Sequence, residues 1–325
     1  MIDSLRFTNF KVLRTTELGL GRYNLVVGPN GSGKSTLFDG LRLLAGQGLQ
    51  LSDWFRSAGI PRGSGVGVTA EWKGARIGYN AVQGGSFKRI SNLSSAVEQE
   101  AWDVIGRTRI FSFNPERIAA PVQLKPAMQL ESDGSGLAGV LDRMRDEFPE
   151  TFEGLNEDIS RLMPEFDRIL FDTPGEGMRA FALRTREGQH KIRATELSHG
   201  VLLAIALLTL SYLPKPPSII GLEEPDRGIH PRLYRDVQDA LYRLSYPESF
   251  GMQRKPAQVI VTTHSPLLLD LHKDHPEEII IAEKTELGSE FHRLSERPDL
   301  AELLEEVSLG EAWYSGILGG VPVAP

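Results

Sequence analysis

The sequence predicts an α/β fold with a mixed-sheet core, a small antiparallel β meander and an inserted helical lobe. Two observations predict the sheet: the apolar segment Tyr23–Val27 leads into a glycine-rich turn and a helix, and later apolar segments end in polar residues. A third observation predicts the insertion, because apolar residues at helical spacing fill the stretch 136–163. With 325 residues, 40% of them hydrophobic, the chain is long enough for one large domain or two ordinary ones.

The first part of the chain is expected to be mostly β. Alternating apolar residues over 2–12 predict strand structure ahead of Tyr23–Val27, and a helix is expected over Leu37–Leu44. The stretch 59–92 is rich in glycine. Short β-type runs within it, at 67–72 and 75–80, predict the antiparallel meander.

The middle of the chain is expected to change from helix to strand and back. The helical stretch 136–163 is broken by Pro149 and sustains no heptad, which predicts a helical subdomain and not a coiled coil. Strands are then expected at Ile169–Phe171 and across Met178–Arg193, which turns at Gly188, before a long apolar helix begins near Ser198. The remaining predicted strands are Ser218–Leu222, Gln258–Thr262 and Glu278–Ala282.

Composition excludes several classes of protein. The net charge of −7 argues against a protein that coats nucleic acid by bulk charge, so any DNA contact would need a local basic patch. The absence of cysteine removes disulfides and zinc-thiolate sites and is compatible with a reducing cytoplasm, where we expect the protein. The longest apolar run, Val201–Leu210, is shorter than the ~20 residues that span a bilayer. Because charged residues interrupt the first segment as well, we expect neither a membrane span nor a signal peptide.

A glycine-rich loop carries the most specific signal. Residues 28–36 read Gly-Pro-Asn-Gly-Ser-Gly-Lys-Ser-Thr and match the P-loop pattern G-x-x-x-x-G-K-[ST] between a strand and a helix. Such a loop turns backbone N–H groups toward the β- and γ-phosphates, with Lys34 supplying charge and the Ser35 hydroxyl binding Mg²⁺. The pattern predicts ATP or GTP binding. The expected contacts are Asn30, Gly31, Ser32, Gly33, Lys34, Ser35 and Thr36.

Two later strands end in polar groups that suit phosphate chemistry. The strand at 218–222 runs into Glu223-Glu224-Pro225-Asp226, where Glu223 is expected at the Mg²⁺ position and Glu224 as the general base. The strand at 258–262 leads to His264, which could reach the γ-phosphate and donate a hydrogen bond. Between the P-loop and these strands, Ser198 is placed to cap a helix whose free N–H groups can hold an anion.

The order of these motifs resembles ABC-type ATPase heads, most closely the RecF/SMC/OLD-like branch of stand-alone predicted AAA-family ATPases. Further matches to that branch are SLRFTNFKVL at 4–13, FSFNPERI at 111–118, EEPDRGIHP at 223–231, VTTHSPLLLD at 261–270 and LGEAWYSGILGG at 309–320. The resemblance implies one ATPase head. Its P-loop core lobe would comprise 1–118 and 214–325, and its helical and signature lobe 119–213.

The resemblance also implies a dimer. Two heads would enclose ATP, with Ser198 and the N–H of Gly200 on the γ-phosphate of the partner's ATP and Asp226 crossing the interface. Two residues depart from the usual pattern: Glu223 stands where an Asp is usual, and His199 replaces a glycine of the signature. The candidates for the Q-loop residue are Asn114 and Gln83.

Several functions fit such a head. One is an ATP-gated DNA clamp or sensor in repair or in defence against foreign DNA. An alternative is a regulatory or assembly subunit acting on a protein such as a separately encoded nuclease or toxin, docking through 122–163 or the tail 313–325. A transporter ATPase fits less well, and no appended nuclease domain is expected. The basic patch that favours DNA comprises Arg179, Arg184, Arg186, Lys191 and Arg193.

Overall fold

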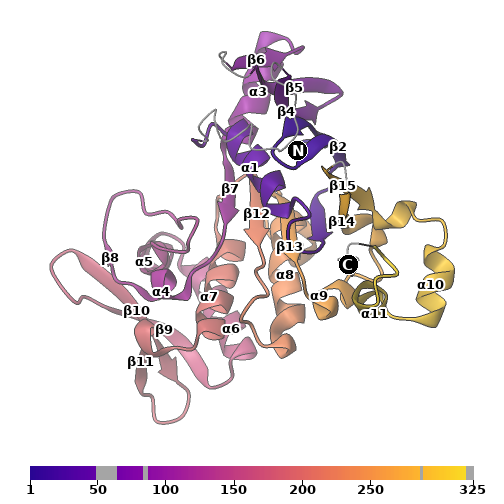
Figure 1. The fold of residues 1–325 in the computed structure, drawn as a ribbon. Helices are drawn as coiled ribbons and strands as arrows, with labels where there is room; N and C mark the ends of the chain where they lie inside the picture. Colours follow the sequence, from indigo (N-terminus) through magenta and orange to yellow (C-terminus); the bar gives the residue numbers. More distant parts are fainter. Residues whose placement is uncertain (49–63, 83–86, 286–287, 320–325) are drawn as a thin grey trace. The chain divides into compact units, whose positions relative to one another are not determined.

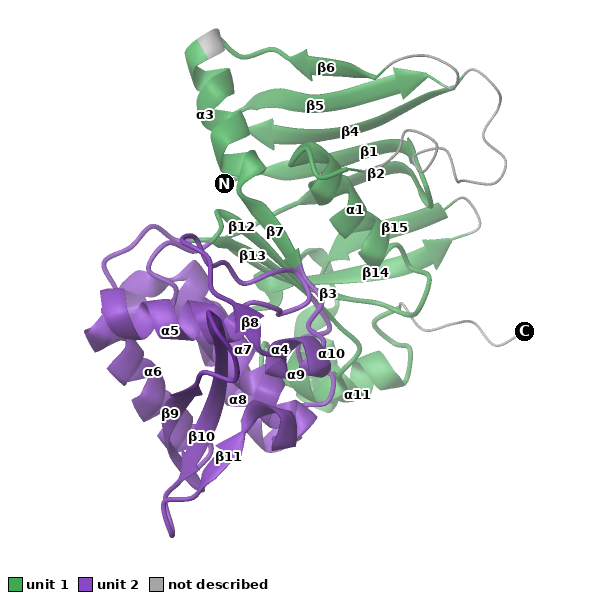
Figure 2. Cartoon of the chain, turned by 90° about the vertical axis from the view of Figure 1, so that its left-hand side faces the viewer, with its two compact units in different colours: residues 1–110, 217–222, 257–325 green, residues 111–216, 223–256 purple. Residues whose placement is uncertain are grey.

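The computed structural model describes residues 1–48, 64–82, 87–285 and 288–319. The chain forms two compact units (Figure 2). Unit 1 comprises residues 1–110, 217–222 and 257–325, and unit 2 comprises 111–216 and 223–256. Relative to the lobes expected from the sequence, 223–256 groups with unit 2, because the helix it contains, α8 (Tyr234–Ser245), packs against α7 (His199–Tyr212).

A six-stranded mixed sheet forms the core of unit 1 (Figure 1). In sheet order the strands are β15 (Gly288–Arg293), β14 (Ile279–Thr285), β3 (Tyr23–Val27), β13 (Gln258–Thr263), β12 (Ile219–Glu223) and β7 (Thr108–Phe111). The central strand β3 pairs in parallel with both β13 and β14, whereas β14 and β15 are antiparallel. Every residue of β3 and β13 is buried, which explains why apolar residues follow one another at the centre of each strand instead of alternating with polar ones. The predicted mixed sheet is confirmed.

The predicted meander belongs to a larger antiparallel sheet. Its order is β2 (Leu13–Gly19), β1 (Ser4–Phe10), β4 (Gly65–Trp72), β5 (Ala75–Val82) and β6 (Lys88–Ser91). The N-terminal strands are thus part of the same sheet as the glycine-rich segment, with β1 pairing to β4. Helices α1 (Lys34–Leu44) and α3 (Ser95–Gly106) contribute buried side chains to the apolar core beside this sheet.

The middle of α1 packs closely on the antiparallel sheet. A β-carbon added to Gly40 would lie 3.0 Å from the Phe7 ring carbon Cζ, so this helix position has room only for glycine. Leu37, Phe38 and Leu41 are almost fully buried on the same helix. Side chains of α1, the helix that follows the P-loop, therefore share one apolar core with side chains of the mixed sheet and of the antiparallel sheet.

Unit 2 combines helices with a small sheet. Its longer helices are α5 (Leu137–Glu147), α6 (Pro149–Leu162), α7 and α8, and its strands are β8 (Val122–Gln123), β9 (Phe166–Asp172), β10 (Met178–Thr185) and β11 (Lys191–Arg193). Strand β10 pairs with β8, β9 and β11. The helical subdomain and the hairpin turning at Gly188 are confirmed, and α7 is buried from Leu202 to Ser211.

The C-terminal segment of unit 1 packs on the helix that follows β13. In α9 (Pro266–Asp270) the Asp270 carboxylate accepts a 2.7 Å hydrogen bond from the Gly310 N–H at the start of α11 (Leu309–Tyr314). Between them lies α10 (Leu300–Glu306). Trp313 is buried, whereas Tyr314 is 82% and Ile317 46% exposed. The shorter elements of the two units are α4 (Pro115–Ala119) and 3₁₀ helices at Ala194–Glu196, Pro231–Leu233, Pro247–Phe250, Pro276–Glu278 and Leu294–Glu296.

Across the described residues, none of the helices combines the length and the apolar character that a membrane span requires.

A buried histidine behind the start of β3 makes stability depend on pH. The His272 ring stacks on Tyr23, its Nδ1 donates to the Leu268 carbonyl at 2.9 Å, and its Nε2 lies 3.2 Å from the Tyr23 hydroxyl. Burial lowers the pKa of His272 to about 4. Because the unfolded chain, with a pKa of about 6.5, takes up the proton first, the neutral ring stabilises the fold fully above that pH. The free energy of unfolding should therefore fall by up to about 3 kcal/mol as the pH drops from about 6.5 to 4.

Urea denaturation across this pH range measures the effect. His272→Gln should flatten the pH dependence, whereas His190→Gln, at an exposed position of unit 2, should leave it unchanged. An equally steep pH dependence in His272→Gln would contradict the assignment.

Candidate nucleotide-binding site

The P-loop connects the central strand of the mixed sheet to α1. It leaves β3 after Val27 and turns through Gly31 and Gly33, whose φ angles of 79° and 92° lie in the left-handed region. The helix α1 has no side-chain cap, and the N–H groups at such a helix start are a common binding site for anions. This is the backbone geometry that binds a phosphate chain.

The P-loop packs against the C-terminal hairpin, which is formed by β14 and β15. A β-carbon at Gly28 would lie 2.5 Å from the Ala282 carbonyl oxygen of β14 and 2.6 Å from Ser32 Oγ, so a larger residue would push the loop off its strand. The sequence analysis missed Ala282, because nothing in a distant apolar strand marks which of its residues touches the loop.

The polar groups of the loop suit a polyphosphate. The Lys34 ammonium is buried and donates to the carbonyls of Gly28 and Pro29 at 2.6 and 2.8 Å, which places a cation inside the loop. Ser32 is 1% exposed, and its hydroxyl has no hydrogen-bond partner among the described residues. Ser35, Asn30 and Gly31 are exposed. A buried cation, a buried hydroxyl with no partner among the described residues and an uncapped helix start together fit a phosphate group.

His264 is brought to the same sheet edge as the P-loop. Val27 and Thr263 are paired across the parallel strands β3 and β13, so the loop and His264 each begin one residue beyond that pair. His264 is half-buried, and Ser265 caps α9 through a hydrogen bond from the Leu268 N–H. The sequence prediction that the two strand ends are neighbours is thus consistent with the register.

Strand β12 continues the arrangement on the other side of β13. The Gln258 N–H bonds to Ser218 O at 2.9 Å and Thr262 Oγ1 to Leu222 O at 3.5 Å, which sets the two strands in the same direction. Glu223 is the last residue of β12. Glu223 is therefore at the C-terminal end of β12, and β13 lies between β12 and β3 in the sheet.

The remaining acids of the motif lie in unit 2. Glu224 has a φ of 45°, a left-handed conformation that is uncommon for a residue with a side chain and that clusters at functional sites. Its carboxylate is 3.9 Å from the guanidinium of Arg227, which is 84% exposed. Asp226 is buried two residues further on.

The acidic loop, residues 224–228, contacts the start of α7, the helix of the signature motif. A β-carbon at Gly200 would lie 2.8 Å from the Gly228 carbonyl oxygen. Ser198 caps α7 as predicted, accepting a hydrogen bond from the Val201 N–H at 3.4 Å, and both Ser198 and His199 are exposed. The residues that the resemblance assigned to a partner's nucleotide thus sit at an open helix start, packed on the loop that follows Asp226.

The Q-loop candidates separate. Asn114 caps α4, accepting hydrogen bonds from the N–H groups of Glu116 and Arg117 at 2.9 and 3.2 Å. Its side-chain oxygen is therefore occupied by a local structural role. Gln83 lies outside the described residues.

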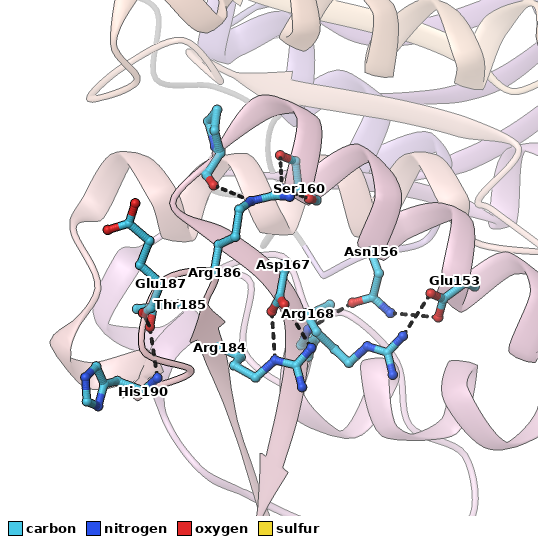
Figure 3. A network of polar contacts seen from close by, with 12 residues as sticks. Glu153, Asn156, Ser160, Asp167, Arg168, Arg184, Thr185, Arg186, Glu187 and His190 are labelled. Atoms are coloured by element: carbon cyan, nitrogen blue, oxygen red, sulfur yellow. Dashed lines mark hydrogen bonds and ion pairs between the residues drawn. The ribbon is translucent and has the colours of Figure 1, made fainter.

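The basic patch is largely neutralised by its own unit (Figure 3). Arg184 forms a two-pronged pair with Asp167 at 2.9 and 2.8 Å, and Arg186 donates to the Pro164 carbonyl and to the Ser160 hydroxyl. Outside the view, Arg179 pairs with Asp142 at 3.1 Å and Lys191 with Asp172. The sequence shows the cations of β10 and β11, but their acidic partners come from α5 and β9. Three of the five cations are therefore paired with carboxylates of the same unit.

Within the described ranges, no three His, Asp or Glu side chains come together in a way that could hold a metal ion.

The mixed sheet, the P-loop and the adjoining strand ends are those of the ABC-type ATPase head fold. A family model described as "AAA domain, putative AbiEii toxin, Type IV TA system" matches residues 24–80 and 70–270, and the chain belongs to this family.

Solved structures share the fold. The SMC head bound to the C-terminal winged-helix domain of ScpA superposes with a TM-score of 0.63 at 16% identity, covering 90% of this chain and 96% of that one. An SMC head from Thermotoga maritima gives a TM-score of 0.53 at 18% identity, covering 90% and 98%. A Pyrococcus furiosus SMC head with an extended coiled coil, bound to the C-terminal domain of ScpA, gives 0.57 at 15% identity, covering 94% and 98%.

A curated protein is also similar in sequence. The OLD nuclease of Thermus scotoductus (strain ATCC 700910 / SA-01) is 22% identical over 326 residues, covering 84% of this chain and 60% of the relative. The chain thus spans about 60% of the length of that protein.

Proposed function

We propose that the protein is a Mg²⁺-dependent ATPase whose two copies enclose ATP and whose hydrolysis controls their association. The P-loop carries this proposal, because it combines a buried cation, a helix start with no side-chain cap and a buried hydroxyl that has no hydrogen-bond partner among the described residues. When bound with the nucleotide, Mg²⁺ would neutralise charge that develops on the phosphate oxygens. Ser35 and Glu223 are the residues that would hold it.

The reaction is the attack of water on the γ-phosphorus, which breaks its bond to the bridging oxygen and gives ADP and phosphate. In this proposal Glu224 orients the water and accepts its proton, and Lys34 leaves the Gly28 and Pro29 carbonyls to neutralise the phosphates. His264 donates a hydrogen bond to the γ-phosphate. Support comes from three strands that are neighbours in the sheet. The P-loop with Lys34 follows β3, His264 follows β13, and Glu223 is the last residue of β12.

The dimer is proposed from the exposed start of α7. Ser198 and the N–H of Gly200 would bind the γ-phosphate of the partner's ATP, and Asp226 would lie at the interface. An uncovered helix start offers donors that an incoming phosphate can satisfy. The contact of Gly200 with Gly228 supports the proposal, since it ties the acidic loop to this helix within unit 2.

Sedimentation velocity with ATP, ADP or no nucleotide, each with and without Mg²⁺, tests this function. We expect a dimer only with Mg²⁺ and ATP, and release of phosphate at a rate that rises with the square of protein concentration at low concentration. A protein that hydrolyses ATP equally fast at all dilutions would contradict the enclosed dimer.

Two effectors remain candidates. DNA, in repair or in defence against foreign DNA, is supported by the similarity to an OLD nuclease and by the SMC-type fold. The paired cations of the hairpin argue against that surface as its contact. DNA binding would lose affinity steeply with salt if phosphates are contacted. Binding of a duplex that does not depend on ATP or salt would exclude the clamp.

A protein partner is the second candidate, and an exposed apolar group favours it. Leu267 of α9 is 53% exposed, and α9 packs against α11. Tyr314 at the end of α11 and Ile317 after it are exposed as well. SMC heads have been solved with a bound domain of ScpA, so heads of this fold can carry a protein partner. Copurification with the products of neighbouring genes, compared between the parent and Tyr314→Glu, distinguishes this candidate from DNA. Equal recovery of every partner by both proteins would exclude the α9–α11 surface.

A further inference from the structure

Two buried hydroxyls lie against the P-loop without a hydrogen-bond partner among the described residues. One is Ser32 within the loop, 1% exposed, and the other is Ser289 of β15, 3% exposed. A buried hydroxyl that makes no hydrogen bond costs stability, and such groups are rare in folded proteins. Their position at the same loop points to a second state of the loop in which both are satisfied.

Ser289 is held in place by its backbone. It pairs with Lys284 in the β14–β15 ladder, and its carbonyl accepts a 2.9 Å hydrogen bond from Thr16 Oγ1 of β2. The ladder therefore fixes the position of the Ser289 backbone beside the loop. A β-carbon built on Gly33 would lie 3.2 Å from both Ser289 Cβ and Ser289 Oγ. The hydroxyl thus lies next to the last glycine of the loop.

Lys34 satisfies the loop carbonyls in this structure. Its ammonium donates to Gly28 O and Pro29 O, and Ser32 Oγ is near the same Gly28. A polyphosphate would draw the ammonium toward itself, since a charged pair is a stronger partner than neutral carbonyls. The carbonyls would then need another donor, and the Ser32 hydroxyl is the adjacent one.

We propose that Ser289 is a positioning residue for the nucleotide loop: its hydroxyl bonds the loop backbone at Gly33 only when the loop holds a phosphate chain, while Ser32 replaces Lys34 at Gly28. This rests on the proposed nucleotide binding. Through Ser289 the C-terminal hairpin, which is more than 250 residues from the loop in sequence, becomes part of the binding site. Ser289 touches no nucleotide atom in this account and acts through the loop.

The test compares Ser289→Ala with the parent in two measurements. Thermal unfolding without nucleotide should show a melting temperature about 2 °C higher for the variant, because an unsatisfied hydroxyl is removed. Calorimetric titration with ADP and Mg²⁺, which avoids turnover, should show five- to tenfold weaker binding, because the bound loop loses a hydrogen bond. Ser289→Cys has a side chain of similar size that is a weak donor, so its melting temperature and its affinity for ADP should lie between those of the parent and of Ser289→Ala.

Thr108→Val is the matched control. Thr108 is a buried hydroxyl of the same unit that does have a partner, the Ile105 carbonyl at 2.6 Å. This variant should melt lower than the parent and bind ADP equally well. A Ser289→Ala protein that melts lower, or that binds ADP as tightly as the parent, overturns the inference and leaves the proposed ATPase standing. If the parent itself fails to bind ADP and ATP, the proposed function falls as well.

Discussion

Lys34→Ala is expected to weaken ATP binding by about 100-fold or more, equivalent to about 3 kcal/mol. The ammonium is the only side-chain cation within the loop sequence 28–36, and it lies buried against the Gly28 and Pro29 carbonyls. Without it, the phosphates would meet only neutral donors, and a charged hydrogen bond contributes about twice as much as a neutral one. Calorimetric titration with ATP and Mg²⁺ measures the loss.

The control for charge is Lys73→Ala. Lys73 forms an exposed ion pair with Glu100 at 3.0 Å, a kind of pair that contributes at most about 1 kcal/mol to stability. This variant should bind ATP like the parent. Tight ATP binding by Lys34→Ala would show that the nucleotide is held elsewhere.

Glu224→Gln is expected to slow hydrolysis by about 10² to 10⁴-fold while leaving ATP binding intact, so that the ATP-bound dimer accumulates. Glutamine keeps the size of the side chain and can still orient a water, but it cannot accept its proton. The left-handed backbone of this residue, with φ at 45°, is demanded equally of both side chains, so a change in stability is not expected. Phosphate release and sedimentation with ATP measure the two effects.

Glu187→Gln serves as the matched control, since Glu187 is an exposed acid in the hairpin of the same unit. It should hydrolyse ATP at the parent rate. Turnover by Glu224→Gln at the parent rate would remove Glu224 from the role of base, and Glu223→Gln would then be the next variant to compare.

The parts of the fold that the sequence predicted well are those encoded locally. The P-loop is contiguous, the strands 23–27 and 258–263 each contain three consecutive apolar residues, and Ser198 is a strong cap, so each can be recognised without its neighbours. The amphipathic helix α8, 234–245, was not predicted although its apolar residues recur at helical spacing. It is also the helix that groups 223–256 with unit 2.

The parts that could not be predicted depend on pairs distant in sequence. The cations of the hairpin read as a basic patch until Asp142, Asp167 and Asp172 are placed beside them. Neither the left-handed conformation of Glu224 nor the support of the P-loop by Ala282 has a local signal, because each is imposed by packing from other elements. Motif order therefore indicated the fold better than it indicated the electrostatics of the surface.

The pairing of β3 has a consequence for the protein during synthesis. The partners of this strand, residues 23–27, in the described part of the chain are β13 and β14, at 258–263 and 279–285. At a ribosomal rate of about 5–20 residues per second, the segment that holds the P-loop waits roughly 10–50 seconds for its neighbours to emerge. Long-range pairing of this kind forms late. A nascent chain therefore has the complete P-loop sequence long before it has a nucleotide pocket, and ATP can stabilise the protein only once nearly all of this sequence has been made.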